Sequence, residues 1–233
     1  METGQPHHAF SRTEFYALLS ALAVLAATVL TALAHSREPG QRIGCVNNLR
    51  QLGVALMTYS SENDGMFPPR SSPFWPGKLQ RFYGDSSVLR CPADTVNSAD
   101  TAPRSYIMNG WDDYFHATLD FPNWTAFQDH VYPFGITESA IPRPSETIAF
   151  GEKFSSSHHF HVDTIIDPAD DVAQVEQSRH FRTKPSDSTS GGSNYAMADG
   201  SVRFLKFGAA LVPVNLWFVL DPGRTNNTSA LAQ

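Results

Sequence analysis

Clustered positive charge is missing from this sequence. The 233 residues carry 17 Lys and Arg against 23 Asp and Glu, the formal net charge is −6, and no two basic residues are adjacent. Proteins that bind nucleic acids contact phosphates with clustered Lys and Arg, so we expect no nucleic-acid partner.

Cysteine is scarce, and recognisable catalytic motifs are absent. The two cysteines, Cys45 and Cys91, form no C-x-x-C pair, which argues against a zinc ribbon or a thioredoxin-like site. They form one disulfide or serve as small buried apolar residues, and both alternatives stay open. The sequence also has no G-x-S-x-G elbow, phosphate loop or dinucleotide fingerprint. We therefore expect a protein that is not an enzyme and that holds no cofactor.

The sequence does contain a long apolar run near its N-terminus. Phe15 to Ala34 is 20 residues without a charge. A helix of that length spans about 30 Å, the thickness of a bilayer core, so we expect a membrane helix. One alternative is a buried core helix. Another is a secretory signal peptide cleaved after Ala32-Leu33-Ala34, which would release a chain that starts at His35.

A phenylalanine and a glutamate with a fixed spacing precede this run. Phe10 follows Ala9, Glu14 comes four residues later, and the apolar residues begin directly after it. The pattern resembles the type IV prepilin signal of pilins and of type II secretion pseudopilins. The resemblance implies cleavage between Ala9 and Phe10 by a prepilin peptidase, followed by methylation of the new amine. It also implies that Glu14 pairs with the N-terminal amine of a neighbouring subunit, which would offset the cost of a carboxylate at a membrane helix.

A second helical pattern follows Pro39-Gly40, where we expect an interruption or a kink. Apolar residues recur at helical spacing and polar residues fill the other face, up to a turn at Asp64-Gly65. The apolar set is Ile43, Val46, Leu49, Leu52 or Gly53, and Leu56; the polar set is Arg42, Asn47, Asn48, Arg50 and Gln51. The pattern predicts an amphipathic helix that lies against a sheet.

The remaining sequence predicts short strands, one short helix and long loops. We expect strands at 105–109 and 146–152, a helix at 78–83, and an aromatic loop at 111–133. Residues 194–198 and 201–205 form a hairpin, and Asp199-Gly200 between them predicts a two-residue type I′ turn. We expect the aromatic side chains to cover a small sheet, and binding of a glycan or protein by these side chains is the alternative.

Several segments of the domain match one group of proteins. They are 45–53, 62–65, 67–69, 90–94, 105–110, Gly191-Gly192-Ser193-Asn194 and Asp199-Gly200. These segments resemble a large bacterial group of prepilin-like proteins of largely unknown function, with a C-terminal His-x-Asp-Gly signature. The resemblance implies a pilin-like α+β fold, in which a long N-terminal spine helix packs on a small antiparallel sheet.

One position of that signature differs. Thr189 stands where the group has its histidine, and the nearest histidine before it is His180, so either 183–190 is an insertion or the histidine has been lost. We interpret Asp199-Gly200 as turn chemistry. The alternative is a calcium loop like that of major pseudopilins, for which Asp187 and Asp199 supply too few ligands.

Two clusters of polar residues follow the strand at 146–152. His158, His159 and His161 lie beside three serines, and we expect an exposed loop with metal binding as the alternative. The four aspartates at 163, 167, 170 and 171 do not have the spacing of an EF-hand, and we expect a solvated acidic loop.

We therefore predict a leader at 1–9, a transmembrane segment at 10–36, an extracytoplasmic pilin-like domain at 37–224 and a flexible tail at 225–233. The expected function is that of a structural subunit of a pseudopilus-like or pilus-like envelope fibre. Its expected partners are copies of itself, the prepilin peptidase and the inner membrane. The alternative is a membrane-anchored or secreted binding module that uses a prepilin-like export signal.

Overall fold

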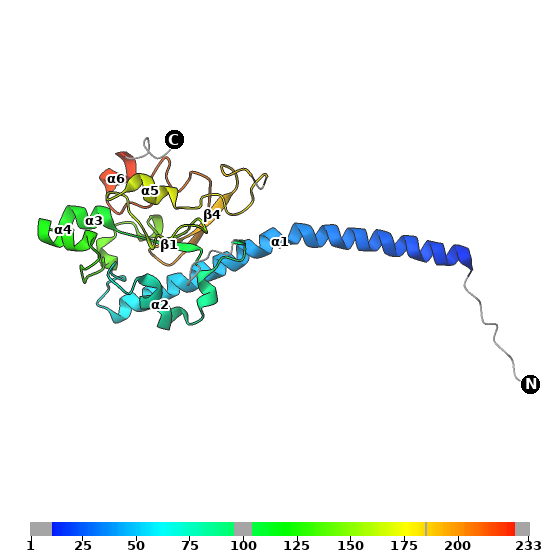
Figure 1. The fold of residues 1–233 in the computed structure, drawn as a ribbon, viewed down its shortest axis with the longest axis horizontal. Helices are drawn as coiled ribbons and strands as arrows, with labels where there is room; N and C mark the ends of the chain where they lie inside the picture. The colour runs from blue at the N-terminus through cyan, green and yellow to red at the C-terminus, as the bar shows by residue number, and fades with distance from the viewer. Residues whose placement is uncertain (1–10, 96–103, 185, 227–233) are drawn as a thin grey trace, which may run out of the picture. The chain divides into compact units, whose positions relative to one another are not determined.

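The computed structural model describes residues 11–95, 104–184 and 186–226. The chain divides into two compact units, residues 1–40 and 41–233. Helix α1 (Arg12–Glu62) contains residues of both units, and an α+β domain follows it (Figure 1). The predicted leader at 1–9 and most of the predicted tail lie outside the described residues.

Helix α1 continues through Pro39, so the predicted interruption at Pro39-Gly40 is wrong. A proline inside a helix removes one backbone hydrogen bond and brings its ring against the preceding turn. The helical residues on both sides of Pro39 are numerous enough to continue the helix despite this local loss.

The second unit is built around a five-stranded sheet with the order β3-β1-β2-β4-β5. The strands are β1 (Tyr106–Asn109), β2 (Ile148–Glu152), β3 (His161–Val162), β4 (Gly192–Met197) and β5 (Val202–Lys206). All neighbouring pairs are antiparallel except β1 and β3, which are parallel. The sheet is therefore mixed, and the expectation of a purely antiparallel sheet is wrong. The chain reverses direction between β2 and β3, so β3 runs parallel to β1.

Each face of the sheet carries its own apolar cluster. In β1, Tyr106 belongs to the cluster that includes α1, whereas its neighbour Ile107 belongs to the cluster on the opposite face. A β-bulge in β2 changes this alternation. Ile148 pairs with Met197, and Phe150, two residues later, pairs with Ala196, which is only one residue away from Met197 in β4. The extra residue sends the side chains of Ile148 and Phe150 into different clusters.

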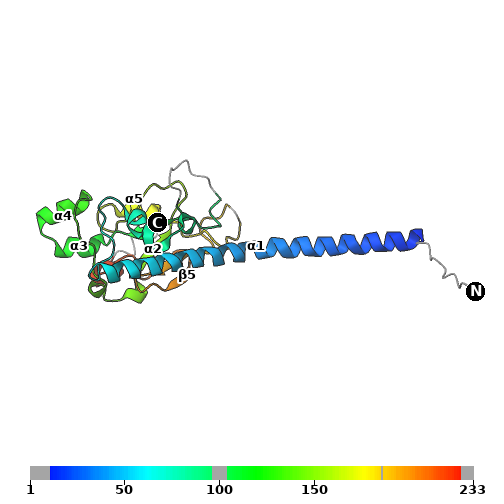
Figure 2. The ribbon, with the colours of Figure 1, turned by 90° about the horizontal axis from the view of Figure 1, so that it is seen from below.

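The second part of α1 covers one face of the sheet (Figure 2). Its fully buried apolar side chains are Cys45, Leu49, Leu52, Ala55 and Leu56. Ile43 is 55% exposed, so its predicted place in the buried stripe is wrong. Because Cys45 is held by the domain, the buried stripe starts there and follows the i, i+4, i+7 spacing through Leu49 and Leu52.

Two polar residues predicted for the solvent face of this helix make tertiary contacts instead. Asn48 is half-buried and its Nδ2 donates to the carbonyl of Arg90 at 2.6 Å. The guanidinium of Arg42 lies 5.2 Å from the ring centroid of Phe204 and 5.5 Å from that of Phe181. Both side chains therefore help to hold α1 against the domain.

Short helices complete the domain. They are α2 (Trp75–Tyr83), α3 (Asp112–Thr118), α4 (Phe121–Gln128), α5 (Pro168–Ala173) and α6 (Asp221–Asn226), with 3₁₀ turns at Ser86–Leu89, Glu138–Ala140 and Pro144–Glu146. Helix α2 begins three residues before the predicted 78. The predicted loop at 111–133 is wrong, because α3 and α4 occupy most of it. These helices have 7 and 8 residues, too few for an apolar period to be recognised.

The hairpin between β4 and β5 forms as predicted, but its turn does not. Met197 pairs with Ser201, so the loop has three residues, and Gly200 N–H donates to the Met197 carbonyl at 2.9 Å. Gly200 has φ +81°, whereas Asp199 has an ordinary negative φ. A two-residue type I′ turn needs positive φ at both central residues, so the loop is a type I turn closed by a left-handed glycine.

Candidate functional site

Glu14 lies at the start of the apolar part of α1. Its Oε2 accepts hydrogen bonds from Ser11 N and Ser11 Oγ, each at 2.9 Å, and Glu14 N donates to Ser11 Oγ at 3.3 Å. This reciprocal arrangement is a capping box, which satisfies donors that the first helical turn leaves free. The predicted processing residues Ala9 and Phe10 lie outside the described residues.

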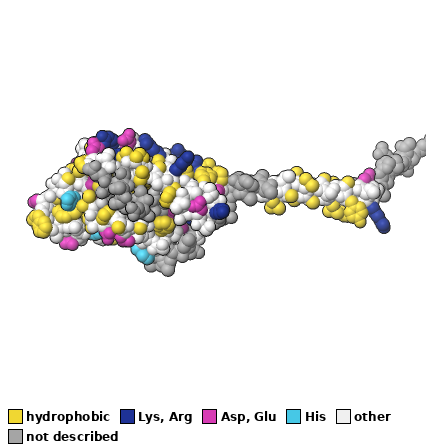
Figure 3. Space-filling view, turned by 90° about the horizontal axis from the view of Figure 1, so that it is seen from above, with side chains coloured by type: hydrophobic (Ala, Val, Ile, Leu, Met, Phe, Trp, Pro, Cys, Tyr) yellow, Lys and Arg dark blue, Asp and Glu magenta, His cyan; other side chains and the backbone are white. Residues whose placement is uncertain are grey.

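The residues after Glu14 present an apolar surface on every side. The segment Arg12–Leu30 is long and apolar enough to cross a membrane, and its side chains are exposed within the structure. Figure 3 shows uncharged side chains along this described segment, with charge at its beginning. Such a helix serves as an anchor or as a signal sequence.

Cys45 and Cys91 form a disulfide with a Cα to Cα distance of 4.7 Å. Both residues are buried, at 0% and 1% exposure. The disulfide alternative is thereby confirmed, and it ties α1 to the turn at residues 91–94. Disulfides persist in oxidising compartments, which points to a location outside the cytoplasm.

A buried cluster surrounds Asn194. Its backbone N–H donates to Glu152 Oε2 at 3.1 Å, and Glu152 Oε1 lies 2.9 Å from His180 Nε2. His180 and Gly192 exchange two backbone hydrogen bonds of 2.9 Å, so residues 181–191 leave and rejoin the sheet edge at one point. His180 is thereby held beside β4 with its ring against Glu152.

Asp199 and Asp187 accept hydrogen bonds within their own turns. Asp199 accepts from Ser201 N at 2.9 Å, and Asp187 accepts from Thr189 N and Thr189 Oγ1, each at 2.9 Å. Hydrogen bonds, that from Thr183 first, hold the pKa of Asp187 below its usual range. Short Asp side chains commonly bond the backbone two residues further on in this way.

The predicted histidine and aspartate loops meet at one polar cavity of about 280 Å³, which Arg70 and His130 also line. His161 lies in β3 and is 5% exposed, so the prediction of an exposed histidine loop is wrong for it, while His158 is exposed. The parallel pairing of β3 with β1 buries His161. Burial lowers the pKa of His161 well below its usual value, so the ring is neutral near pH 7.

Two of the four aspartates predicted for a solvated loop are buried. Asp163 is 6% exposed and forms a bidentate pair with Arg70, with N to O distances of 2.5 and 2.8 Å. Burial raises the pKa of Asp163 to about 7, against the opposing effect of Arg70. Asp171 is 4% exposed, and burial raises its pKa as well. Asp167 and Asp170 are exposed, as predicted.

His159 lies between the two aspartates at the start of α5. Its Nδ1 is 2.6 Å from Asp171 Oδ1, and its Nε2 is 3.4 Å from Asp170 Oδ2. The ring is 37% exposed, so it faces the opening of the cavity rather than its interior. This arrangement allows either a histidine shared by two carboxylates or a metal-binding group.

Two buried aspartates outside these predictions organise the surrounding loops. Asp112 accepts hydrogen bonds from the backbone N–H groups of residues 164, 165 and 166, at 2.8, 2.6 and 3.0 Å. Asp113 accepts from Val219 N and Leu220 N, each at 2.8 Å, and burial raises its pKa to about 6. The tandem aspartates directly after Trp111 are the sequence signal, but their partners lie about 50 and 106 residues away.

A scan against protein-family models, a search of curated proteins and a search of solved structures found no match to this chain. The structure itself establishes an N-terminal apolar helix, followed by an α+β domain with one disulfide. The functional assignment below therefore rests on the residues of this chain.

Proposed function

We propose that this protein is a membrane-anchored structural subunit that assembles through its N-terminal helix into a pilus-like or pseudopilus-like envelope fibre. One observation carries the proposal. The apolar segment Arg12–Leu30 exposes its described side chains on all sides, and Glu14 is its one acidic residue.

The physical argument starts from the apolar surface. A helix that is apolar on every face is stable in lipid or against similar helices, so copies of α1 would pack laterally in the bilayer. Glu14 then lies at the membrane boundary, where a charged carboxylate is energetically unfavourable, and a positively charged partner reduces that free-energy cost. The new amine of Phe10 in a neighbouring subunit is a partner of the required charge, as the resemblance to prepilin signals implies.

The α+β domain supports the same assignment. A helix that continues from the membrane segment and packs on a sheet resembles the arrangement in pilins, and the Cys45–Cys91 disulfide fits an extracytoplasmic domain. The proposal thus includes processing by a prepilin peptidase and an ectodomain outside the inner membrane.

The capping box gives Glu14 a second role, which the experiment must separate from assembly. Glu14→Gln removes the charge but keeps a side chain that can complete the cap. Ser11→Ala removes the cap but keeps the charge. Assembly is measured as cross-linked oligomers in envelope membranes and as fibres sheared from the cells.

We expect Glu14→Gln to reduce oligomers and fibres at least tenfold, while Ser11→Ala stays close to wild type. The domain should keep its disulfide in both variants, because Cys45 and Cys91 lie in the second unit. Normal assembly of Glu14→Gln would contradict the proposal. Loss of assembly in Ser11→Ala alone would show that Glu14 acts only as a helix cap.

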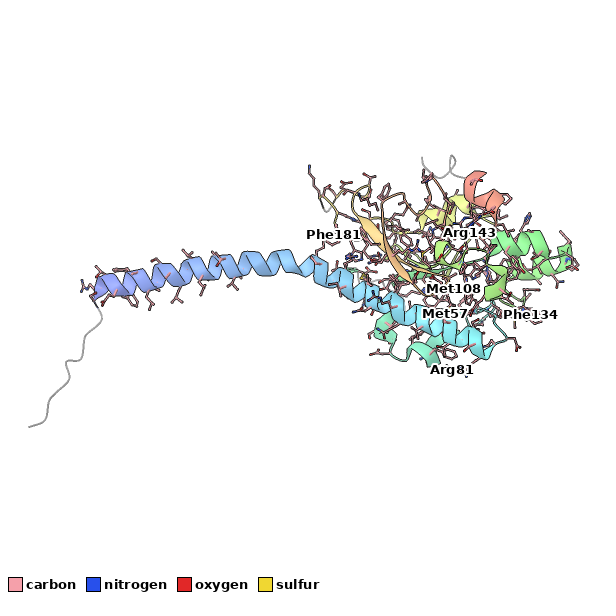
Figure 4. All side chains as sticks on the ribbon, turned by 180° about the vertical axis from the view of Figure 1, so that it is seen from behind. Met57, Arg81, Met108, Phe134, Arg143 and Phe181 are labelled. Atoms are coloured by element: carbon pink, nitrogen blue, oxygen red, sulfur yellow. A yellow bond between two sulfur atoms is a disulfide. The ribbon has the colours of Figure 1, made fainter. Side chains whose placement is uncertain are left out.

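The second candidate, a binding module, is favoured by exposed apolar side chains around α4. Phe121 is 81% exposed, Val131 66% and Phe134 54% (Figure 4 labels Phe134). The rings of Trp111, Phe115 and Phe127 are buried, as expected for residues that cover the sheet, and those of Tyr114, Trp124 and Tyr132 are half-buried. Retarded migration in polysaccharide gels, abolished by Phe121→Ala, would support the module; unchanged migration in all gels would exclude a glycan ligand.

A further inference from the structure

We propose that His159 and Asp170 bind a divalent transition-metal ion, such as Zn²⁺, at the mouth of the polar cavity, and that Asp171 orients His159. This site lies in the second unit and is independent of the assembly role of α1. The ligand atoms of these three residues all lie within 4.8 Å of one another.

Asp171 fixes the state of the His159 ring. A separation of 2.6 Å between His159 Nδ1 and Asp171 Oδ1 is that of a charge-assisted hydrogen bond. The proton on Nδ1 leaves the lone pair of Nε2 available on the other side of the ring. Histidines that bind metals commonly donate their second nitrogen to a carboxylate in this way.

Asp170 lies at the distance expected for a second ligand. His159 Nε2 and Asp170 Oδ2 are 3.4 Å apart, which is long for a charged hydrogen bond. Two ligands at tetrahedral positions, each about 2.0–2.1 Å from a zinc ion, are separated by about 3.3 Å. The observed gap therefore matches the edge of a coordination tetrahedron.

Helix α5 explains why adjacent aspartates take different roles. Asp167 caps this helix through Asp170 N at 3.4 Å, and Pro168 occupies its first position. Neighbouring residues in a helical turn point in directions about 100° apart, so Asp171 turns inward while Asp170 stays at the surface. Asp171 Oδ2 also accepts from Asp163 N at 3.3 Å, which holds the orienting carboxylate in place.

A second observation points into the same cavity. His161 borders it, is 5% exposed, and its Nε2 has no hydrogen-bond partner among the described residues. A buried nitrogen without a hydrogen-bond partner is unfavourable, so a ligand is expected to satisfy it. Water bound to a metal at His159 and Asp170 can donate to His161 Nε2, and imidazole with carboxylate is a ligand set suited to zinc.

Aspartates outnumber Lys and Arg among the described residues that line the cavity. Arg70 lines the cavity and its guanidinium is paired with Asp163. Arg104 lies behind His159, where its Nη2 donates to the backbone carbonyls of His158 and His159 at 2.7 and 2.8 Å. Asp167 and Asp170 add negative charge at the opening. A divalent cation would therefore meet an acidic entrance.

The test titrates the full-length, tag-free chain in detergent micelles with Zn²⁺ by calorimetry, and with Co²⁺ by visible absorption. We expect one ion per chain. His159→Ala and Asp170→Asn should each weaken Zn²⁺ binding at least a hundredfold. Asp171→Asn should weaken it about 10–100-fold, as expected for a residue that orients a ligand.

His158→Ala is the matched control, because it removes an exposed histidine next to His159. We expect this variant to bind Zn²⁺ like wild type. Absence of binding heat in the wild type would overturn the site, as would equal losses in His158→Ala and His159→Ala, which indicate adventitious binding to surface histidines. Asp170 is 52% exposed, so Asp170→Asn reports on binding without disturbing the core.

Discussion

Buried carboxylates organise the loops of this domain by accepting hydrogen bonds from backbone N–H groups. Asp112 and Asp113 bind segments that follow β3 and precede α6, far away along the chain. Glu152 does the same for β4 through Asn194 N. Each such carboxylate satisfies donors that would otherwise be buried without partners, so its removal disrupts a loop as well as a charge.

Asp113 makes the stability of the domain depend on pH. Burial raises its pKa from 3.8 to about 6, so the folded state holds this proton more tightly than the unfolded state. The residue thus favours folding below pH 3.8, and this contribution is lost as the pH rises to about 6. A shift of about two units corresponds to about 3 kcal/mol.

We predict that Asp113→Asn gains stability relative to wild type by about 3 kcal/mol as the pH rises from about 4 to about 7. The measurement is urea unfolding of both proteins across this range. Asp129→Asn, at an exposed position, is the control and should follow wild type. If the unfolding free energies of Asp113→Asn and wild type changed with pH in parallel, the charge of Asp113 would not be destabilising.

At the scale of elements, α1 approaches the β4–β5 hairpin so closely that little room is left for a side chain at Gly53 of the helix. A Cβ on Gly53 would lie 3.0 Å from the Gly200 carbonyl oxygen and 3.2 Å from the Gly200 Cα. Both atoms belong to the backbone of a tight turn, so the helix or the turn would have to shift by a few tenths of an ångström.

We predict that Gly53→Ala destabilises the domain by about 1–3 kcal/mol. Helix propensity alone predicts the opposite sign, a gain of about 1 kcal/mol, so the experiment separates the two effects. Gln51→Ala, at an exposed position of the same helix, is the control and should be close to neutral. A stabilised Gly53→Ala variant in thermal unfolding would refute the close contact.

The disulfide also acts between elements, because it joins α1 to the turn after Ser86–Leu89 across 46 residues. Closing a loop of this length is expected to stabilise the folded state by about 4 kcal/mol through the unfolded chain. We predict that Cys45→Ala with Cys91→Ala lowers the unfolding free energy by about that amount, measured in urea. Reductant should lower the unfolding free energy of the wild type by the same amount and leave that of the double variant unchanged. If reductant also destabilised the double variant, the loss could not be attributed to the disulfide.

Local patterns predicted the elements that depend on neighbouring residues. The apolar helix, the strands β1 and β2, the β4–β5 hairpin and the turn at Asp64-Gly65 follow from spacing and turn chemistry. The short helices α3 and α4 could not be recognised over two turns. The polar cavity could not be predicted from the sequence for a different reason. Whether His161 and Asp163 are buried depends on β3 pairing with β1, more than 50 residues earlier in the chain.

At the scale of the whole molecule, the chain combines two units with different needs. The first unit is an apolar helix, whose surface can be buried in lipid or against other helices. The second unit has two apolar clusters of its own, one on each face of the sheet. The fold of the second unit therefore does not require the surface of the first. This division suits a subunit that is held and assembled by one part and displays the other.

The most direct test of this account is the N-terminal sequence and intact mass of the protein purified from envelope membranes. We predict a chain that begins at a methylated Phe10, because the amine proposed to pair with Glu14 exists only after cleavage between Ala9 and Phe10. A chain that begins at His35 would be a released protein without its apolar helix. A chain that retains Met1 would be anchored but would lack that amine, and either result would contradict assembly through Glu14.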